Sequence, residues 1–204
     1  MSEHYFSEKP TSPEERGLIR CTLRGVDLEL VSSSGVFSHR RIDNGTRLLV
    51  ESMELPGEGR LLDLGCGYGA IGITAALINP HLEVWMTDVN TRATALAKEN
   101  AARNGARNTV ILQGNLYEPL ESAKFETIVT NPPISAGMAK VVKPIIAGAP
   151  SHLNAGGSLQ LVVQSNKGGR TVAALIEETF GEAQILAKGG GYRVLKGVKK
   201  GSEV

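Results

Sequence analysis

The alternation of two hydrophobic patterns after residue 58 constrains the fold of this chain more than any other feature of its sequence. Apolar runs typical of strands occur at 60–64, 82–88, 108–113, 125–130 and 158–163. Helical patterns lie between and after them, at 70–78, 91–104, 139–153 and 170–180. Strands that alternate with helices form βαβ units, so we expect a doubly wound α/β fold with a largely parallel sheet.

The end of the chain departs from this alternation. Two further strand-like segments, 183–187 and 191–198, flank the turn Gly189-Gly190-Gly191. No crossover helix fits in so short a turn, so these two strands are expected to pair antiparallel. We therefore predict a mostly parallel, seven-stranded sheet with an antiparallel edge strand.

The segment before the sheet has patterns of its own. Two short strands are expected around Arg24-Gly25, which would form a small hairpin, and apolar residues at helical spacing predict a helix over 46–55. Ser12-Pro13-Glu14-Glu15 combines a cap residue, a first-turn proline and a glutamate, which is typical of the start of a short helix. We expect this small N-terminal extension to pack on the sheet domain.

Composition excludes several classes of protein. Hydrophobic residues make up 41% of the 204 residues, which is too many for a disordered chain, and the formal net charge of +1 gives no global field for nucleic acid. No apolar stretch approaches the ~18 residues of a membrane span, and the polar N-terminus has no signal-peptide core. Cys21 and Cys66 are the only cysteines, and the four histidines have no ligand spacing, so we expect no disulfide framework and no metal site. We expect a cytoplasmic, monomeric protein with one domain over 1–204, in which 1–58 is the extension and 59–204 the catalytic core.

A glycine-rich turn, Gly65-Cys66-Gly67-Tyr68-Gly69, follows the first strand of the core. Its glycines let the backbone turn tightly and approach a ligand with no Cβ in the way. Backbone N–H groups at the start of the next helix favour an anionic or polar ligand group, and doubly wound folds bind ligands at this edge of the sheet. Turns of this kind also occur for packing alone, so the turn is weak evidence by itself.

Asp88 supports the ligand-binding interpretation. It ends the second strand, about 25 positions after Asp63. An acid with that spacing accepts hydrogen bonds from ribose hydroxyls, although it could also cap the helix that follows Asn90. The spacing differs from the dinucleotide pattern G-x-G-x-x-G because Gly69 comes too early, which disfavours a nicotinamide oxidoreductase.

These residues resemble a known family. Asp63 and the three glycines of the turn form D-x-G-x-G-x-G, which is similar to motif I of the class I S-adenosylmethionine-dependent methyltransferases, enzymes with a Rossmann-like fold. In that family the turn passes beside the methionine part of S-adenosylmethionine, and the second-strand acid binds its ribose. The resemblance extends to Asn115 and Leu116, which stand where the family ends its third strand and meets the adenine ring. Many members have Asp at the position of Asn115, and an amide retains the ability to bond the adenine amine.

The stretch Asn131-Pro132-Pro133-Ile134 follows the fourth strand. Its prolines lack backbone N–H groups and fix φ, so the backbone around Asn131 is stiff and cannot continue the sheet. The Asn131 side-chain oxygen and the Pro132 carbonyl could therefore grip both hydrogens of an exocyclic amine, aim its nitrogen at the methyl group and stabilise the charge that develops there. N-P-P with an apolar or aromatic residue is similar to motif IV of amino-methyltransferases. The alternative is a proline-stiffened loop without chemistry.

Ile134 bears on the kind of amine. Adenine-N6 and glutamine-N5 methyltransferases commonly have Tyr or Phe at this position to stack on a flat target, whereas Ile134 offers only apolar contact. An aromatic partner must then come from elsewhere, and Tyr5, Phe6 and Phe37 are the candidates.

The N-terminal half narrows the resemblance to one subgroup. Gly35-Val36-Phe37-Ser38, Asp43 and Gly45-Thr46-Arg47-Leu48-Leu49 are similar to small-domain methyltransferases related to the catalytic half of the bacterial small-subunit (16S) ribosomal RNA guanine-N2 methyltransferase. The resemblance implies that Phe37 lies over the target and Thr46 over the cofactor. Arg40 and Arg41 could meet RNA phosphates, or they could be solvated surface residues. The bacterial enzyme has an additional N-terminal half that this chain lacks.

We therefore expect a methyltransferase that uses S-adenosylmethionine to modify an exocyclic amine, guanine N2 in ribosomal RNA first of all. The RNA partner would be small-subunit ribosomal RNA or its precursor particle. The alternatives are adenine N6, a transfer RNA guanine, a protein glutamine N5, or a cofactor-binding RNA module without activity. The expected catalytic residues are Asn131, Pro132, Pro133 and Ile134, and the expected substrate-binding residues are Phe37, Arg40 and Arg41. The expected cofactor-binding residues are Thr46, Asp63, Gly65, Gly67, Gly69, Asp88, Asn115 and Leu116.

Overall fold

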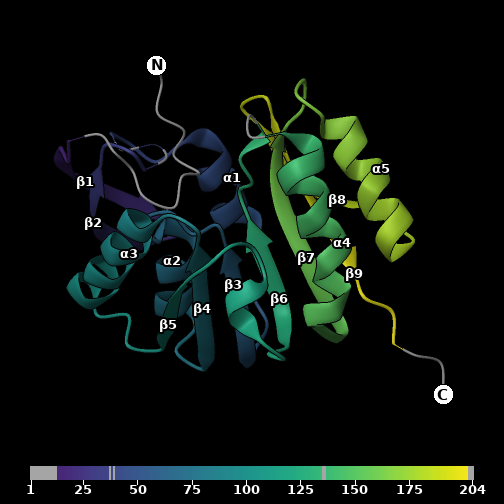
Figure 1. Cartoon of the computed structure of the whole chain (residues 1–204), viewed down its shortest axis with the longest axis horizontal. Helices are drawn as coiled ribbons and strands as arrows, with labels where there is room; N and C mark the ends of the chain where they lie inside the picture. Colours follow the sequence, from purple (N-terminus) through teal and green to yellow (C-terminus); the bar gives the residue numbers. More distant parts are fainter. Residues whose placement is uncertain (1–12, 37, 39, 135–136, 202–204) are drawn as a thin grey trace.

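A seven-stranded sheet forms the centre of the protein in a computed structural model that describes residues 13–36, 38, 40–134 and 137–201 (Figure 1). The strand order is β5-β4-β3-β6-β7-β9-β8. The strands are β3 (Gly59–Leu64), β4 (Leu82–Asp88), β5 (Thr109–Gln113), β6 (Phe125–Thr130), β7 (Leu153–Gln164), β8 (Gln184–Gly189) and β9 (Tyr192–Val198). The predicted mostly parallel, seven-stranded sheet is confirmed.

The antiparallel part of the sheet lies at the β8 end. β9 runs antiparallel to both β7 and β8, whereas the other pairs are parallel. The chain leaves β7, crosses to the edge as β8, and returns through the tight glycine turn into the gap between them. The antiparallel strand itself is therefore second from the edge.

Helices cover both faces of the sheet. α1 (Asn44–Ser52), α2 (Ala70–Ile78) and α3 (Thr91–Asn104) pack on one face, and α4 (Lys143–His152) and α5 (Gly169–Phe180) pack on the other (Figure 1). Successive strand residues serve different cores: Leu61 belongs to the cluster under α1, α2 and α3, and Leu62 to the cluster under α4 and α5. None of the helices among the described residues is long and apolar enough to cross a membrane.

Three local predictions differ from the structure. The helix predicted over 139–153 begins as a π-helical turn, η3 (Met138–Val142), and becomes α4 only near Pro144, which has no N–H to continue a regular ladder. β7 starts five residues before the predicted 158, because Leu153 already pairs with Phe125. Pro13 to Glu15 are not helical: the Glu15 N–H donates to Ser34 Oγ at 3.0 Å, and Ser12 lies outside the described residues.

The predicted N-terminal hairpin is present. β1 (Arg16–Leu23) and β2 (Val26–Ser33) pair antiparallel through a two-residue turn, in which Arg24 and Gly25 have φ of 46° and 79°. Positive φ at both central positions gives the turn twist that matches paired strands. A one-turn 3-10 helix, η1 (Glu118–Leu120), follows β5, which is the edge strand at the end of the sheet opposite β8.

Two asparagines of α3 join this hairpin to the sheet domain. Asn100 Oδ1 accepts from the Val31 N–H at 2.7 Å, and its Nδ2 donates to the Val31 carbonyl at 2.8 Å. Asn104, one turn later, makes the same pair of bonds with Glu29 at 3.0 and 2.9 Å. Because alternate residues of a strand point their backbone groups the same way, two amides one helical turn apart replace a third strand along β2.

Candidate active site

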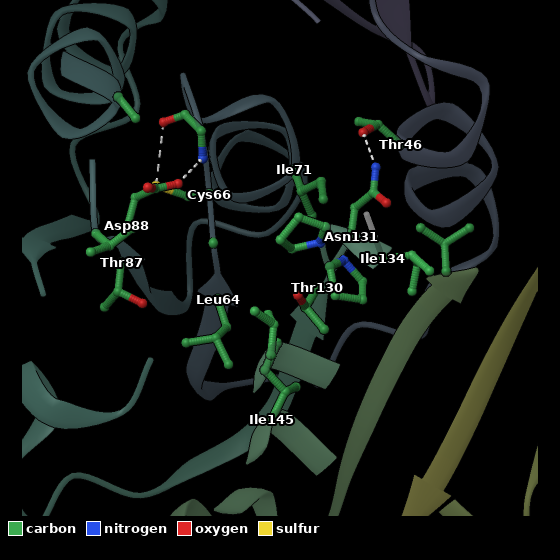
Figure 2. A pocket seen from close by; sticks show the side chains of 18 of the residues that line it. Thr46, Leu64, Cys66, Ile71, Thr87, Asp88, Thr130, Asn131, Ile134 and Ile145 are labelled. Atoms are coloured by element: carbon green, nitrogen blue, oxygen red, sulfur yellow. Dashed lines mark hydrogen bonds between the residues drawn. The ribbon is translucent and has the colours of Figure 1, made fainter. Parts of the chain in front are cut away.

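A cavity of about 660 Å³ opens at the carboxyl ends of β3, β4 and β6 (Figure 2). The chain order reverses here, because β3 pairs with β4 on one side and with β6 on the other. Such a switch point leaves a crevice between the connections to opposite faces, and ligands of doubly wound folds bind there. The volume lies in the usual range for small-molecule sites, roughly 300–1,000 Å³.

The glycine-rich turn after β3 presents bare backbone to this cavity. Gly65 and Gly67 line it, with φ of 76° and 57°, in the left-handed region that favours glycine. The N–H groups of Gly65 and Cys66 both donate to the Thr87 carbonyl, at 2.8 and 2.9 Å, which fixes the turn on β4. A Cβ added at Gly65 or Gly67 would have no atom within 4 Å. This side of the turn therefore has room for a ligand to approach the backbone.

Asp63 and Gly69, the outer members of the predicted motif, are not among the residues that line the cavity. Asp63 is fully buried, and its Oδ2 accepts from the Gly72 N–H of α2 at 2.8 Å. Its Oδ1 has no partner among the described residues, and burial raises the pKa of this carboxyl to about 7. Gly69 has φ of 95° and starts α2. In the structure both residues support the turn from behind.

Asp88 reaches the cavity from the end of β4 and ties the second strand to the glycine turn (Figure 2). Its two carboxylate oxygens accept from the N–H groups of Gly67 and Asn90, both at 2.9 Å. Burial raises the pKa of Asp88, and these backbone bonds partly offset that effect. The cap of α3 is Asn90, whose Oδ1 accepts from the Arg92 N–H at 2.9 Å, so Asp88 is left to face the cavity.

Asn115 and Leu116 line the cavity beyond β5. Asn115 Nδ2 donates to Glu118 Oε1 at 3.2 Å, and within the described parts of the chain no group donates to the oxygen of this amide. Leu116 has φ of 50°, which is uncommon for a residue with a side chain and sets the direction of its backbone. The Gly114 N–H donates to the Asp88 carbonyl at 3.0 Å, so the two strand ends are joined.

Asn131 faces Asp88 from the other side of the cavity (Figure 2). Its Nδ2 lies 3.0 Å from Thr46 Oγ1 and 3.3 and 3.4 Å from the two carboxylate oxygens of Asp43. Among the residues that the structure describes, none donates to Asn131 Oδ1. Thr46, predicted beside the cofactor, lines the cavity and contacts Asn131. Pro132, Pro133 and Ile134 line the cavity as well.

Two buried threonines contribute to the wall of the cavity. Thr87 and Thr130 are buried and line it, and within the described part of the chain neither Oγ1 has a hydrogen-bond partner. Leu64 pairs in register with Thr87, and in Figure 2 its side chain lies between those of Thr87 and Thr130. Both oxygens are buried, so neither is open to a ligand in the cavity, and a buried hydroxyl without a partner costs free energy.

Sequence reasoning missed several residues of the cavity. Asp43 is the N-cap of α1, and an acid before Gly-Thr at a helix start was the available signal. Tyr192 comes from β9 and its hydroxyl accepts from Gln164 Nε2 at 2.9 Å, which no local pattern indicates. Lys140 and Lys167 are exposed and line the cavity.

Of the predicted substrate-binding residues, the two that the structure describes do not line the cavity. Arg40 and Arg41 are exposed, in the loop that leads to Asp43, and neither is among the lining residues. Phe37, Tyr5 and Phe6 lie outside the described residues. Among the described residues, no three His, Cys, Asp or Glu side chains gather into a group that could hold a metal ion.

Comparisons with known proteins agree with this geometry. Residues 27–196 match the family model described as Methyltransferase small domain. The chain is 43% identical to an uncharacterized Bacillus subtilis protein, YbxB, over 98% of this chain and 100% of that protein. It is 32% identical to the ribosomal RNA small subunit methyltransferase C of Erwinia tasmaniensis, over 85% of this chain and 50% of that enzyme.

A solved structure gives the same result. A T. thermophilus 16S rRNA N2 methyltransferase, RsmC, in complex with AdoMet and guanosine superimposes with a TM-score of 0.82 at 28% identity. The match covers 92% of this chain and 52% of that one. The chain therefore spans about half the length of the methyltransferase C relatives it matches.

Proposed function

We propose that this chain, which belongs to the methyltransferase small domain family, methylates the exocyclic N2 amine of a guanine in small-subunit ribosomal RNA. S-adenosylmethionine is the methyl donor. The observation that carries the proposal is the Asn131 amide, whose nitrogen is held by Thr46 and Asp43 while its oxygen is left for the cavity.

The residues around the glycine turn fit the donor. The open space beside Gly65 and Gly67 suits close approach of a ligand to backbone, and Asp88 offers carboxylate lone pairs to ribose hydroxyls. The free oxygen of Asn115 is suited to an adenine amine. When bound, S-adenosylmethionine supplies an electrophilic methyl carbon on a sulfonium. The T. thermophilus relative, solved with AdoMet, supports this assignment.

The role of Asn131 follows from the electronic structure of the target. The lone pair of an exocyclic guanine amine is delocalised into the ring, so the amine is a poor nucleophile. Asn131 Oδ1 and the Pro132 carbonyl accept its two hydrogens, orient the nitrogen and stabilise positive charge as it forms the bond to carbon. With the donor bound, its sulfonium would leave as a neutral thioether as the nitrogen takes up the methyl group, and the methylated nitrogen would then lose one proton to water. Loss of one such acceptor typically costs about 100-fold or more in rate.

Several features support guanine in RNA as the substrate. Ile134 lacks the aromatic ring expected for adenine or glutamine targets, and the T. thermophilus relative was solved with guanosine. Tyr192 lines the cavity with its hydroxyl fixed by Gln164, and we assign it to stack on the target base, beside Phe37, which lies outside the described residues and which we keep as a proposed substrate-binding residue.

Lys140 and Lys167 are the cations we assign to RNA phosphates, because both are exposed where they line the cavity. Replacing both with alanine should weaken RNA binding and lower the slope of log affinity against log salt by up to about 2. The matched control replaces Lys98 and Arg107, which line a separate hollow beside α3, and should leave the slope unchanged. Equal slopes in the two double variants would remove Lys140 and Lys167 from the RNA site.

The remaining expectations belong to this proposal too. We propose that 1–204 acts as one domain, with 59–204 as the catalytic core, and that the protein works as a monomer in the cytoplasm, where its ribosomal substrate is assembled.

The test is to identify the methylated nucleoside. Small-subunit particles and total RNA from cells that lack the protein are incubated with labelled S-adenosylmethionine, and the digested nucleosides are separated by mass. N2-methylguanosine in ribosomal RNA is expected with the wild type and not with Asn131→Ala. If the label appears instead in N6-methyladenosine, in a transfer RNA guanine or in a protein glutamine, that group is the substrate and guanine in ribosomal RNA is not. Tight cofactor binding without any transfer would favour an inactive RNA-binding module, and binding of NAD instead would overturn the proposal.

A further inference from the structure

We infer that Asp43 is a positioning residue that decides which end of the Asn131 amide faces the substrate amine. This inference rests on the proposed function, because orientation matters only if Asn131 must act as an acceptor. The two residues are 88 positions apart in the sequence, and they meet where α1 approaches the end of β6.

The amide of Asn131 has two ends of nearly equal size and opposite hydrogen-bonding character. Shape alone therefore does not select the orientation, and neighbouring donors and acceptors must do so. Thr46 Oγ1, at 3.0 Å, is a hydroxyl and can accept from the amide nitrogen or donate to the amide oxygen. Thr46 is compatible with both orientations.

Asp43 is compatible with only one. Its two carboxylate oxygens lie 3.4 and 3.3 Å from Asn131 Nδ2, and a carboxylate only accepts hydrogen bonds. A flipped amide would place Oδ1 against these oxygens, where lone pairs repel. The carboxylate thus holds the nitrogen towards α1 and leaves the oxygen for the cavity.

The position of the Asp43 carboxylate is itself fixed. Asp43 is the N-cap of α1, and its Oδ1 accepts from the Gly45 N–H at 2.9 Å and the Thr46 N–H at 3.1 Å. Gly45 is packed closely: an added Cβ would lie 2.9 Å from the Tyr192 ring and 3.0 Å from Asp43 Oδ1. The start of α1 is therefore held against β9, and the same side chain that caps the helix reaches Asn131.

A flipped Asn131 would present its two N–H groups to the substrate amine, whose own N–H groups need acceptors. The site would then lose one of its two acceptors and would oppose donor with donor. Asp43 therefore acts on the rate of transfer through Asn131, and it acts on the stability of the protein through α1. These two roles respond differently to substitution, which makes them separable.

Asp43→Asn separates them. Asn is as good an N-cap as Asp, so thermal stability should stay close to that of the wild type. Its own amide can donate to Asn131 Oδ1, which favours the flipped orientation. We expect kcat to fall about 30-fold or more, with the Kd of S-adenosylmethionine within about threefold of wild type. Asp43→Ser also caps the helix but is too short to reach Asn131, so its kcat should fall less. Asp27→Asn makes the same chemical change at an exposed position of β2 and should leave kcat unchanged.

A second measurement does not depend on activity. The side-chain 1H–15N signals of Asn131, identified by their loss in Asn131→Ser, should shift strongly in Asp43→Asn and stay in place in Asp27→Asn. Wild-type kcat and unmoved Asn131 signals in Asp43→Asn would reduce Asp43 to a helix cap and overturn the inference. If the wild type methylates no amine, the proposed function fails, and the NMR comparison still decides whether Asp43 orients Asn131.

Discussion

Asn100 offers the sharpest test of how the N-terminal hairpin supports the cavity. It is fully buried in α3 and makes three hydrogen bonds to backbone: two with Val31 of β2 and a third, at 2.9 Å, to the carbonyl of Tyr68 in the glycine turn. One side chain therefore joins the hairpin, the helix and the turn that faces the cavity. Asn104 binds Glu29 of the same strand from a half-buried position, and it provides a matched control.

Asn100→Ala leaves three backbone groups, on Val31 and Tyr68, without their partners. Each buried group that loses its partner costs about 1–3 kcal/mol, and partial access of water lowers the sum, so we expect a loss of roughly 3–5 kcal/mol. Asn104→Ala should cost about 1 kcal/mol, because water replaces its bonds at a half-exposed site. Urea unfolding followed by circular dichroism measures both, with the free energies compared at equal m values.

The same pair of variants has a functional readout. Asn100→Ala releases the Tyr68 carbonyl and should weaken S-adenosylmethionine binding, whereas Asn104→Ala should leave it unchanged. If the two variants lose the same stability and bind the cofactor equally well, then Asn100 does not couple the hairpin to the turn, and the reasoning is refuted.

Three further predictions concern single side chains of the site. Burial raises the pKa of Asp63 to about 7, so the contribution of this residue to the free energy of unfolding is fully present below about pH 4 and is lost as the pH rises through 7. Urea unfolding should show that the wild type loses on the order of 2 kcal/mol more stability than Asp63→Asn between pH 5 and 8. Parallel curves of stability against pH for the two proteins would contradict this. Gly67→Ala puts a Cβ into the open space beside the turn at a φ of 57°, so calorimetry should show that S-adenosylmethionine binds at least about tenfold more weakly. An unchanged Kd would mean that the ligand does not occupy that space. Tyr192→Leu should raise the KM for RNA about tenfold through lost stacking while Tyr192→Phe stays near wild type, and equal KM values in both variants would remove the ring from the base site.

Much of the fold could be predicted from the sequence because local patterns and the global structure agree. The strands and helices of the sheet domain follow their hydrophobic periods, and the glycine turn and Arg24-Gly25 have the backbone angles that their residue types favour. The antiparallel pairing of β8 with β9 was predicted from one further observation, that no crossover helix fits in a three-glycine turn, whereas the insertion of β9 between β7 and β8 was not predicted. The predicted ends of helices and strands were less accurate where a proline or a pairing strand determines the boundary, as at Pro144 and Leu153.

Most of the predicted site residues that line the cavity stand at or just after strand ends, and Thr46 of α1 was predicted from the family resemblance. Asn131 and Asp88 both stand at strand ends, and the structure brings both to the cavity. Asp63 shows what the motif alone leaves out: Leu64 lines the cavity, and the residue before it in a strand points to the opposite face, towards α2.

The contacts between distant segments had no local signal. Asp43 is an ordinary helix cap in sequence, and only the fold brings it to Asn131. Asn100 belongs to the polar part of a helical pattern, and its bonds to β2 depend on where the hairpin docks. Tyr192 ends up beside the cavity because β9 returns between β7 and β8. Such contacts depend on the packing of whole elements, which a single sequence does not encode in any short window.

The most direct test of the account is the single-turnover rate of methyl transfer by Asn131→Ala, measured with the RNA that the wild type methylates. The account predicts that the rate falls by about 100-fold or more while the Kd of S-adenosylmethionine stays within about threefold, because the variant loses an acceptor for the amine and no contact to the cofactor. A near-normal rate would contradict it and would remove Asn131 from the chemistry.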